Sequence, residues 1–177
     1  GPDTPVVAYV GRLASEKNIP LTFKAFLRFR ELVPEAQMVF IGDGPERKKL
    51  EQTHPELHFA GMRLGEDLAE HYASADFFFF ASTTETFGNV ITEAMASGLA
   101  VLAYDYAAAL RHIEDGVNGY KATYDDEEAY LAAVDTLVAQ RKHWSGVREA
   151  AVQTAQGLSW DAILAKYEDD VAAAMQG

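Results

Sequence analysis

The chain has 177 residues, of which 49% are hydrophobic and 24% are charged, and its formal net charge is −12. This length and balance predict one globular domain that buries its own core, while the acidic charge excludes a general nucleic-acid-binding surface. The absence of cysteine excludes disulfides and thiolate catalysis. The sequence shows no apolar run long enough to span a membrane and no signal-peptide pattern, so we expect a cytoplasmic protein.

Strands and helices are predicted to alternate along the chain. Short apolar runs that are bounded by Gly or Pro predict strands at residues 6–10, 36–45, 57–61, 76–82, 99–104 and 118–122. Helical periodicity and helix-start signals predict helices at residues 19–32, 45–52, 65–75 and 89–98, and from about residue 126 onward, including 160–175. The first helix carries an apolar stripe of Leu21, Ala25, Phe26, Phe29 and Leu32.

The run of four phenylalanines at residues 77–80 has no polar alternation. Such a strand is predicted to be buried on both faces, which is typical of a parallel sheet covered by helices. We therefore predict a doubly wound α/β domain. It should have a Rossmann-like parallel sheet of about six strands, helices on both faces and a helical C-terminal tail.

In a sheet of this kind ligands bind outside the carboxyl ends of the strands, so the loops after the strands are the candidate site. The loop after the first strand, GRLASEKN, has neither the dinucleotide-binding nor the P-loop glycine pattern. It carries two cations instead, Arg12 and Lys17, which together can grip a diphosphate. The alternative is that both are ordinary cations on a solvated loop.

The loop after the fourth strand, STTETFGNVITE, leads from a buried strand into a helix. Gly88 allows the backbone to approach a ligand, and N–H groups near Asn89 and Val90 make the helix start an anion site. Glu93 lies one turn further and can accept two hydrogen bonds from a ribose diol. Glu85 can reach a sugar hydroxyl. The alternative is that Glu93 faces solvent and Glu85 only favours the first turn electrostatically.

Four stretches in this order, GRLASEKN, GDGP, ETFGNVITEAMASG and EDGVNGY, resemble the nucleotide-sugar-binding, C-terminal domain of retaining family 4 (group 1) glycosyltransferases of GT-B fold. The resemblance runs from about residue 6 to residue 167. It implies a hexosyl-type glycosyltransferase that moves a sugar from a nucleotide diphosphate sugar to an acceptor. It also implies that no metal or other cofactor is required, because two cations take the place of a metal.

The resemblance implies roles for individual residues. Arg12 and Lys17 are expected to act in catalysis by binding the donor diphosphate, and Glu85 by contacting the transferred sugar. Glu93 is expected to hold the ribose. Further donor contacts are implied for Gly11, Gly42, Gly61, Met62, Phe87, Gly88, Asn89 and Val90.

Two positions depart from the family pattern. Thr86 stands where the family usually has glycine, which leaves the identity of the sugar open, and Ala100 stands where proline is usual before the fifth strand. Neither departure changes a charged residue. The sequence does not name the base, the sugar or the acceptor.

The resemblance further implies that residues 1–177 form a single donor-binding lobe and that the N-terminal acceptor lobe is absent from the chain. The expected partners are a nucleotide sugar and that missing lobe, without nucleic acid and without an integral membrane segment. Any membrane contact is expected to be peripheral and made by the full-length enzyme. Such a lobe is expected to bind donor without turning it over alone.

Three other classes of protein share some of these features. A glycoside hydrolase also needs two carboxylates, but it has no use for Arg12 and Lys17. A non-catalytic nucleotide-binding module of the same fold stays open, because fold does not fix function. A receiver domain would need an acidic cluster at the first strand's end, where this chain has Arg12.

The scattered histidines show no metal-ligand spacing. Residues 104–106, after the fifth strand, either edge the ligand pocket or only end the strand.

Overall fold

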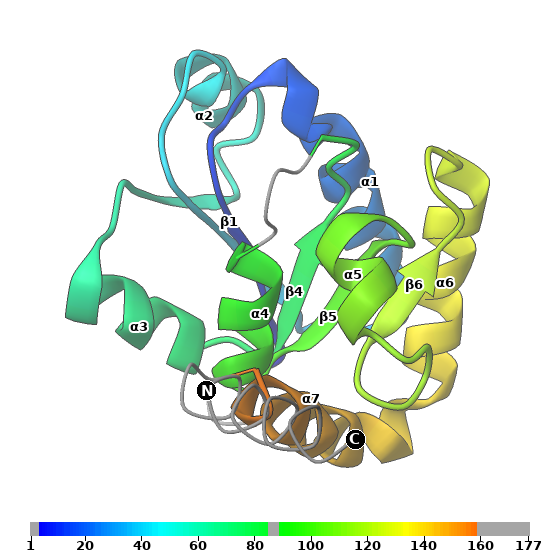
Figure 1. The fold of residues 1–177 in the computed structure, drawn as a ribbon. Helices are drawn as coiled ribbons and strands as arrows, with labels where there is room; N and C mark the ends of the chain where they lie inside the picture. The colour runs from blue at the N-terminus through cyan, green and yellow to red at the C-terminus, as the bar shows by residue number, and fades with distance from the viewer. Residues whose placement is uncertain (1–3, 85–88, 159–177) are drawn as a thin grey trace, which may run out of the picture.

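The computed structural model describes residues 4–84 and 89–158, which form alternating strands and helices (Figure 1). The strands are β1 Val6–Val10, β2 Gln37–Ile41, β3 His58–Gly61, β4 Phe77–Phe80, β5 Ala100–Tyr104 and β6 Tyr120–Ala122. The helices are α1 Ile19–Leu32, α2 Arg47–Thr53, α3 Gly65–Ala73, α4 Asn89–Ala96, α5 Ala107–His112, α6 Glu127–Ala139 and α7 Trp144–Gln156. Short 3-10 turns at Ser15–Lys17 and Arg141–His143 lie just before α1 and α7.

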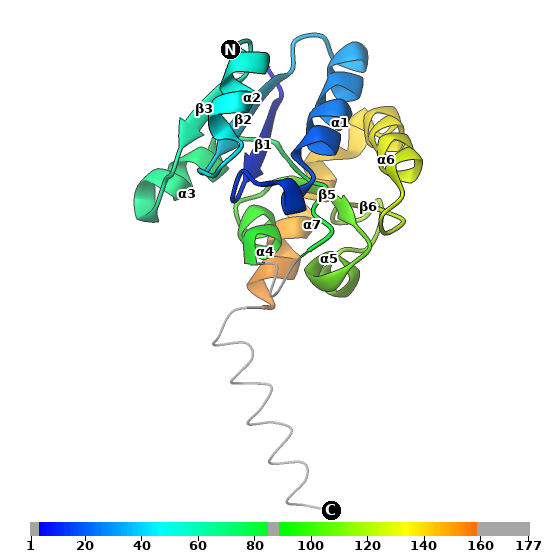
Figure 2. The same cartoon turned by 90° about the horizontal axis from the view of Figure 1, so that it is seen from above.

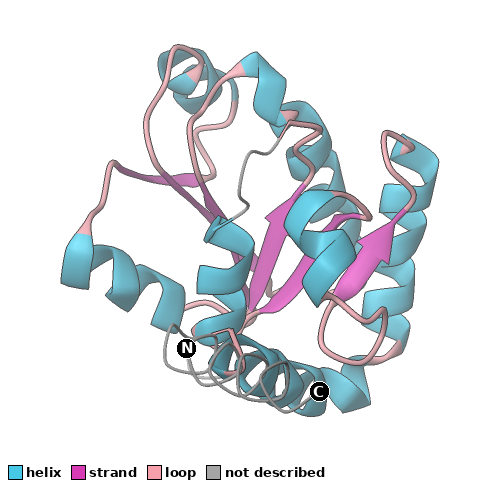
Figure 3. Ribbon diagram, viewed as in Figure 1, coloured by secondary structure: helices cyan, strands magenta, loops and turns pink. Residues whose placement is uncertain are grey.

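The six strands make one parallel sheet in the order β3-β2-β1-β4-β5-β6 (Figure 3). The chain builds outward from β1 to β3 and then returns to the middle to build outward from β4 to β6. The order therefore reverses between β1 and β4, where Val7 pairs with Phe77 and Ala8 with Phe78. In open α/β sheets the crevice at the carboxyl ends beside this reversal is the usual ligand site.

Helices cover both faces of the sheet, as the alternation predicts. Helices α1 and α6 pack together on one face, and α4, α5 and α7 pack on the other (Figure 2). The phenylalanines of β4 serve both faces and are all buried. The rings of Phe77 and Phe79 lie 5.2 and 5.7 Å from Phe29 of α1, while Phe78 lies 6.3 Å from Tyr72 of α3. The predicted two-sided burial of this strand is confirmed.

Helix α1 has the predicted bounds but a slightly different buried face. Its buried residues are Ile19, Leu21, Thr22, Ala25, Phe26 and Phe29. Leu32 was predicted to complete the stripe, but it is 41% exposed, so this part of the prediction is wrong. Leu32 is the last residue of the helix, and the chain turns away there before Pro34, so the core contact passes to the fully buried Val33.

Of two other helices, α6 was predicted from the sequence and α5 was not. Helix α6 is capped by Asp126, because the side chain of Asp126 accepts a hydrogen bond from the Ala129 amide at 2.9 Å. Helix α5 was not predicted. It is only six residues long and begins at Ala107, whose φ of 48° is unusual for a residue other than glycine. The tail predicted at residues 160–175 lies outside the described residues.

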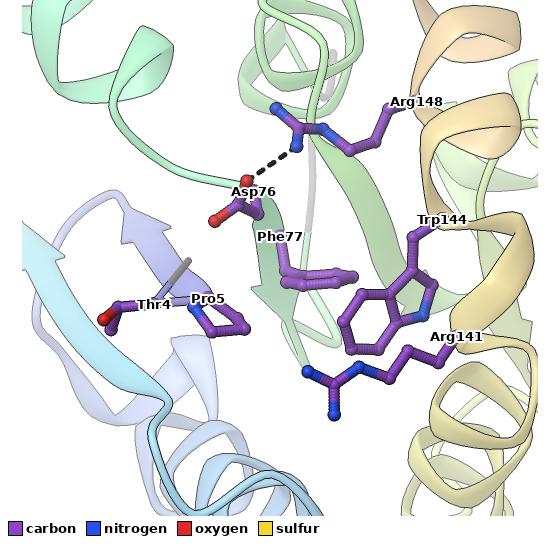
Figure 4. A pocket seen from close by; sticks show the side chains of 7 residues that line it. All are labelled: Thr4, Pro5, Asp76, Phe77, Arg141, Trp144 and Arg148. Atoms are coloured by element: carbon purple, nitrogen blue, oxygen red, sulfur yellow. Dashed lines mark hydrogen bonds and ion pairs between the residues drawn. The ribbon is translucent and has the colours of Figure 1, made fainter. Parts of the chain in front are cut away.

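Helix α7 is fastened to the amino edge of the sheet. Arg148 donates to Asp76 at 2.6 Å and to the carbonyl of Gly98 at 2.6 Å, and the other Asp76 oxygen accepts from the Val6 amide at 2.9 Å. The Trp144 ring meets Phe77 edge-on at 4.7 Å. A cavity of about 290 Å³ opens here (Figure 4); it is lined by Thr4, Pro5, Asp76, Phe77, Arg141, Trp144 and Arg148.

Within residues 4–84 and 89–158, no helix combines the length and the apolar character that crossing a bilayer requires.

Candidate functional site

The loops after β1 and β2 are connected by hydrogen bonds between their backbones. The Gly11 amide donates to the Ile41 carbonyl at 3.0 Å, and the Leu13 amide donates to the Asp43 carbonyl at 2.9 Å. The contact is so close that a Cβ on Gly42 would lie 2.0 Å from the Gly11 carbonyl oxygen, and φ at Gly42 is +138°. Gly42 was predicted as a donor-binding residue, and the structure gives it a packing reason as well, because no side chain fits there.

The end of β3 is hydrogen-bonded to the loop after β2. The Gly42 amide donates to the Gly61 carbonyl at 2.8 Å, and Gly61 has a φ of +78°. The two apolar side chains that follow, Met62 and Leu64, are 62% and 73% exposed. Exposure of two large apolar residues beside a conformationally fixed loop is typical of a surface that a ligand covers.

A cavity of about 420 Å³ lies where these loops meet α3 and α4. Its size suits a small-molecule ligand. Six of the predicted catalytic and donor-binding residues line it: Gly11, Arg12, Gly42, Met62, Val90 and Glu93. The remaining lining residues are Val10, Ile41, Asp43, Arg63, Leu64 and Leu68. The cavity therefore sits at the carboxyl ends of β1, β2 and β3, next to the reversal of strand order.

Glu93 projects from α4 into the lining of this cavity and has a buried partner. The phenol of Tyr72, on α3, donates to Oε2 of Glu93 at 3.1 Å. Burial, followed by the negative charge of Glu93, raises the pKa of Tyr72 far above its ordinary value. Tyr72 therefore stays protonated at neutral pH and acts as a fixed donor, which orients the carboxylate.

The predicted cations lie on the loop after β1, where Arg12 also lines the cavity. The side chain of Arg12 is 66% exposed, and its guanidinium lies 3.7 Å from the Glu16 carboxylate, a loose contact. The ammonium of Lys17 donates to the Thr84 carbonyl at 2.8 Å and lies 5.8 Å from the centre of the Phe80 ring. The Thr84 hydroxyl donates in return to the Glu16 carbonyl at 3.2 Å. These contacts bring the cationic loop against the loop after β4.

Not every predicted residue can be placed. The predictions for Glu85, Phe87 and Gly88 lie outside the described residues. Asn89 begins α4, and Gly61 adjoins the cavity without lining it. Tyr104 is buried, and neither it nor Asp105 or Tyr106 lines this cavity, so their place at the edge of the ligand pocket stays a prediction.

Sequence reasoning did not single out four residues that the structure brings to the cavity or to Glu93: Asp43, Arg63, Leu68 and Tyr72. The first two lie in loops that directly follow strands, so their position was the available signal. Leu68 and Tyr72 lie on α3, and nothing in their local pattern separates them from core residues. In the described residues, no group of three or more His, Asp or Glu side chains could hold a metal ion.

A family model described as glycosyl transferases, group 1, matches residues 4–140. The chain belongs to this family. Its fold is the Rossmann-like fold found in GT-B glycosyltransferases, as the sequence resemblance implied. The matched residues include all three loops that line the cavity and both predicted cations.

Curated relatives of this group 1 chain are glycosyltransferases. A GDP-mannose-dependent alpha-mannosyltransferase of Corynebacterium glutamicum is 36% identical over 172 residues, which cover 94% of this chain and 40% of that protein. The sulfoquinovosyl transferase SQD2 of Arabidopsis thaliana is 33% identical over 175 residues, which cover 96% of this chain and 33% of that protein. The chain thus spans about a third to two fifths of these relatives.

Solved structures agree with this assignment. The pneumococcal O-GlcNAc transferase GtfA, in complex with UDP and GlcNAc, superposes with a TM-score of 0.79 at 27% identity, and the match covers 97% of this chain and 36% of that chain. The sucrose-phosphate synthase of Thermosynechococcus elongatus superposes with a TM-score of 0.78 at 26% identity, and the match covers 98% of this chain and 47% of that chain.

Proposed function

We propose that this chain is the donor-binding lobe of a retaining glycosyltransferase, and that it holds a nucleoside diphosphate sugar. The observation that carries the proposal is the cavity itself. Residues predicted separately for the base, the diphosphate and the ribose line one cavity of suitable size at the switch point of the sheet. The relatives and neighbours support the same ligand class, because one is named as GDP-mannose-dependent and another is solved with UDP and GlcNAc.

The nucleoside is proposed to lie toward β3. There Met62 and Leu64 offer exposed apolar surface to the base, and Glu93 accepts hydrogen bonds from the ribose hydroxyls. Tyr72 occupies one carboxylate oxygen of Glu93 and thereby fixes the direction in which the other lone pairs point. A carboxylate held in this way binds a diol at a lower entropic cost than a mobile one.

The diphosphate is proposed to lie across the ends of β1 and β4. Arg12 would supply a planar fork and Lys17 a point charge, and the amides that begin α4 at Asn89 and Val90 would add the positive end of the helix. No metal is needed in this proposal, because these groups neutralise the diphosphate. Glu85, by the family resemblance, would contact the transferred sugar.

In the proposed reaction, the bond between the anomeric carbon and the diphosphate oxygen breaks, and that oxygen keeps the electron pair. An acceptor hydroxyl oxygen takes its place at the same carbon with the same configuration, and the proton of that hydroxyl passes to the departing diphosphate. Negative charge therefore builds on the diphosphate as the bond breaks. Fixed donors aimed at such charge typically contribute about 2.7–4 kcal/mol each to lowering the barrier, which is the role proposed for Arg12 and Lys17.

The chain is proposed to need a second lobe for turnover, since it spans only about a third to two fifths of its relatives. The experiment is calorimetric titration with UDP, GDP and ADP, followed by incubation with the matching labelled nucleotide sugar and an acceptor panel. We expect binding of at least one nucleotide and no transfer. Absence of binding by all three nucleotides would refute the donor site, while efficient transfer would refute the need for a second lobe.

A further inference from the structure

Two exposed tyrosines lie together at the carboxyl edge of the sheet, outside the donor cavity. Tyr106 follows β5 and is 38% exposed, and Tyr124 follows β6 and is 45% exposed. Their ring centres are 4.8 Å apart, with 40° between the ring planes. Among the large apolar residues described, these are two of the few that stay exposed, and they form a continuous aromatic surface, the tyrosine pair.

The tyrosine pair is rigidly supported. The Tyr124 hydroxyl donates to the Thr83 carbonyl at 3.0 Å, and the Tyr124 ring lies edge-on to Tyr104 at 6.0 Å. Tyr104 is buried and packs in turn on Tyr130, at 5.1 Å, whose hydroxyl donates to a β5 carbonyl. Aromatic side chains that are already fixed lose little conformational entropy when a ligand covers them. A ligand can therefore stack on the two tyrosine rings at a low entropic cost.

The position of the tyrosine pair relates it to the donor. Thr83, which anchors Tyr124, directly precedes Thr84, which anchors Lys17. Along the strand order, the cavity spans the ends of β3, β2 and β1, the loop after β4 comes next, and the tyrosine pair follows at β5 and β6. The pair therefore lies beyond the diphosphate end of the proposed donor site, on the side away from the nucleoside.

The charges around the tyrosine pair indicate what kind of molecule it can take. Asp105 directly precedes Tyr106, and Asp125 directly follows Tyr124. Burial, followed by the carboxylates of Asp125, Glu127 and Asp126, raises the pKa of Tyr104 to about 12. Of these carboxylates, Glu127 is paired with Lys24 at 2.7 Å. Nearby Lys121 is paired with Asp105 at 2.8 Å. An acidic border disfavours phosphates and anionic lipid, whereas carboxylates and carbonyls accept hydrogen bonds from a neutral polyol.

We propose that Tyr106 and Tyr124 form a stacking subsite for a sugar ring of the acceptor. The apolar face of a pyranose covers the two rings, and its hydroxyls donate to the surrounding carboxylates. This inference rests on the proposed donor site, because that site defines which side of the loop after β4 the acceptor approaches. Tyr106 and Tyr124 are binding residues in this assignment and take no part in bond breaking.

The test is saturation-transfer NMR of the whole chain with methyl α-mannopyranoside and methyl α-glucopyranoside, in the presence of saturating UDP or GDP. We expect weak binding of at least one glycoside. Tyr106→Ala and Tyr124→Ala should each weaken it by roughly fivefold to tenfold, the size of a ring-stacking contact, while Tyr106→Phe keeps it. Tyr124→Phe keeps the ring but loses the bond to Thr83, and so separates stacking from loop anchoring.

The control is Val117→Ala, which removes another exposed apolar side chain, 49% exposed, from before β6 at the opposite edge. It should leave glycoside binding unchanged, and all variants should bind the nucleotide as wild type does. If the nucleotide binds but no glycoside does, the subsite is refuted while the donor site stands. If no nucleotide binds, both proposals fail.

Two further results would also overturn the assignment. If Tyr106→Ala weakens a nucleotide sugar but neither the free nucleotide nor the glycosides, the pair holds the transferred sugar. If the chain sediments with anionic vesicles through these tyrosines and shows no glycoside signal, the pair contacts a membrane.

Discussion

Glu93→Gln changes one oxygen of the cavity into an amide nitrogen and leaves the size of the side chain almost unaltered. In the protein, Oε2 accepts from Tyr72 at 3.1 Å, and the carboxylate lines the cavity. A carboxylate can accept from Tyr72 and from two ribose hydroxyls at once, whereas the amide must present a donor on one side. The substitution therefore removes about one charge-assisted hydrogen bond to the ribose.

Hydrogen bonds to charged groups contribute about 1.5–3 kcal/mol, so the affinity for a ribonucleotide should fall about 10-fold to 150-fold. The measurement is calorimetric titration of wild type and Glu93→Gln with UDP and GDP, and with their 2′,3′-dideoxy analogues. The analogues lack both hydroxyls, so they should bind wild type and variant alike. Unfolding curves of the two proteins should show that the variant is folded at the titration temperature.

Tyr72→Phe is the matched positioning variant, since it removes the phenol oxygen and keeps the ring beside Phe78. It should weaken ribonucleotide binding less than Glu93→Gln does, and it should also spare the dideoxy analogues. The ribose assignment would be refuted if Glu93→Gln weakened the dideoxy and ribo forms equally. It would also be refuted if the variant preferred the ribo form as strongly as wild type does.

Three further predictions follow from other contacts. Arg12→Ala should weaken a nucleoside diphosphate by at least about 10-fold yet leave the nucleoside nearly unaffected, because only the diphosphate meets the guanidinium; titration with uridine and UDP measures this. Gly42→Ala would place a Cβ 2.0 Å from a backbone oxygen and should cost about 2–4 kcal/mol of unfolding free energy, whereas Gly146→Ala, with nothing within 4 Å, should not destabilise α7. Arg148→Ala removes two hydrogen bonds of 2.6 Å and should cost about 1–2 kcal/mol in chemical denaturation without changing nucleotide affinity.

The element pattern was predictable because local signals and burial coincide over most of the chain. The unbroken run at Phe77–Phe80 predicted a strand buried on both sides, and a helix predicted from about residue 126 corresponds to α6, which Asp126 caps. The apolar stripe of α1 was correct except at its last residue, where the chain turns away from the core. Helix α5 escaped prediction because it has six residues and begins at a left-handed alanine.

The site was predictable only as far as parallel strands bring their following loops to one edge. This topological rule sufficed to gather Arg12, Gly42 and Met62 around one cavity. The rule gave no signal for Tyr72, which meets Glu93 from a separate helix, 21 positions away in the sequence. It also gave none for the bond between Lys17 and Thr84, 67 positions apart, which depends on the shape of two loops. Contacts between side chains of different elements were the part that periodicity does not encode.

Backbone hydrogen bonds join the loops at both edges of the sheet, but the side chains at the two edges have different roles, and this difference bears on how the site can change. At the carboxyl edge, backbone hydrogen bonds between Gly11, Ile41, Gly42 and Gly61 hold the loops in place, so the side chains of Arg12 and Met62 are not needed to maintain the loop geometry. At the amino edge, backbone bonds such as that from the Asp76 amide to the Val6 carbonyl are joined by a side-chain ion pair, that of Arg148 with Asp76. Substitutions of ligand-facing side chains at the carboxyl edge should therefore alter which base or sugar is bound while leaving the fold intact. Equivalent substitutions at the amino edge should alter stability and leave the ligand unchanged.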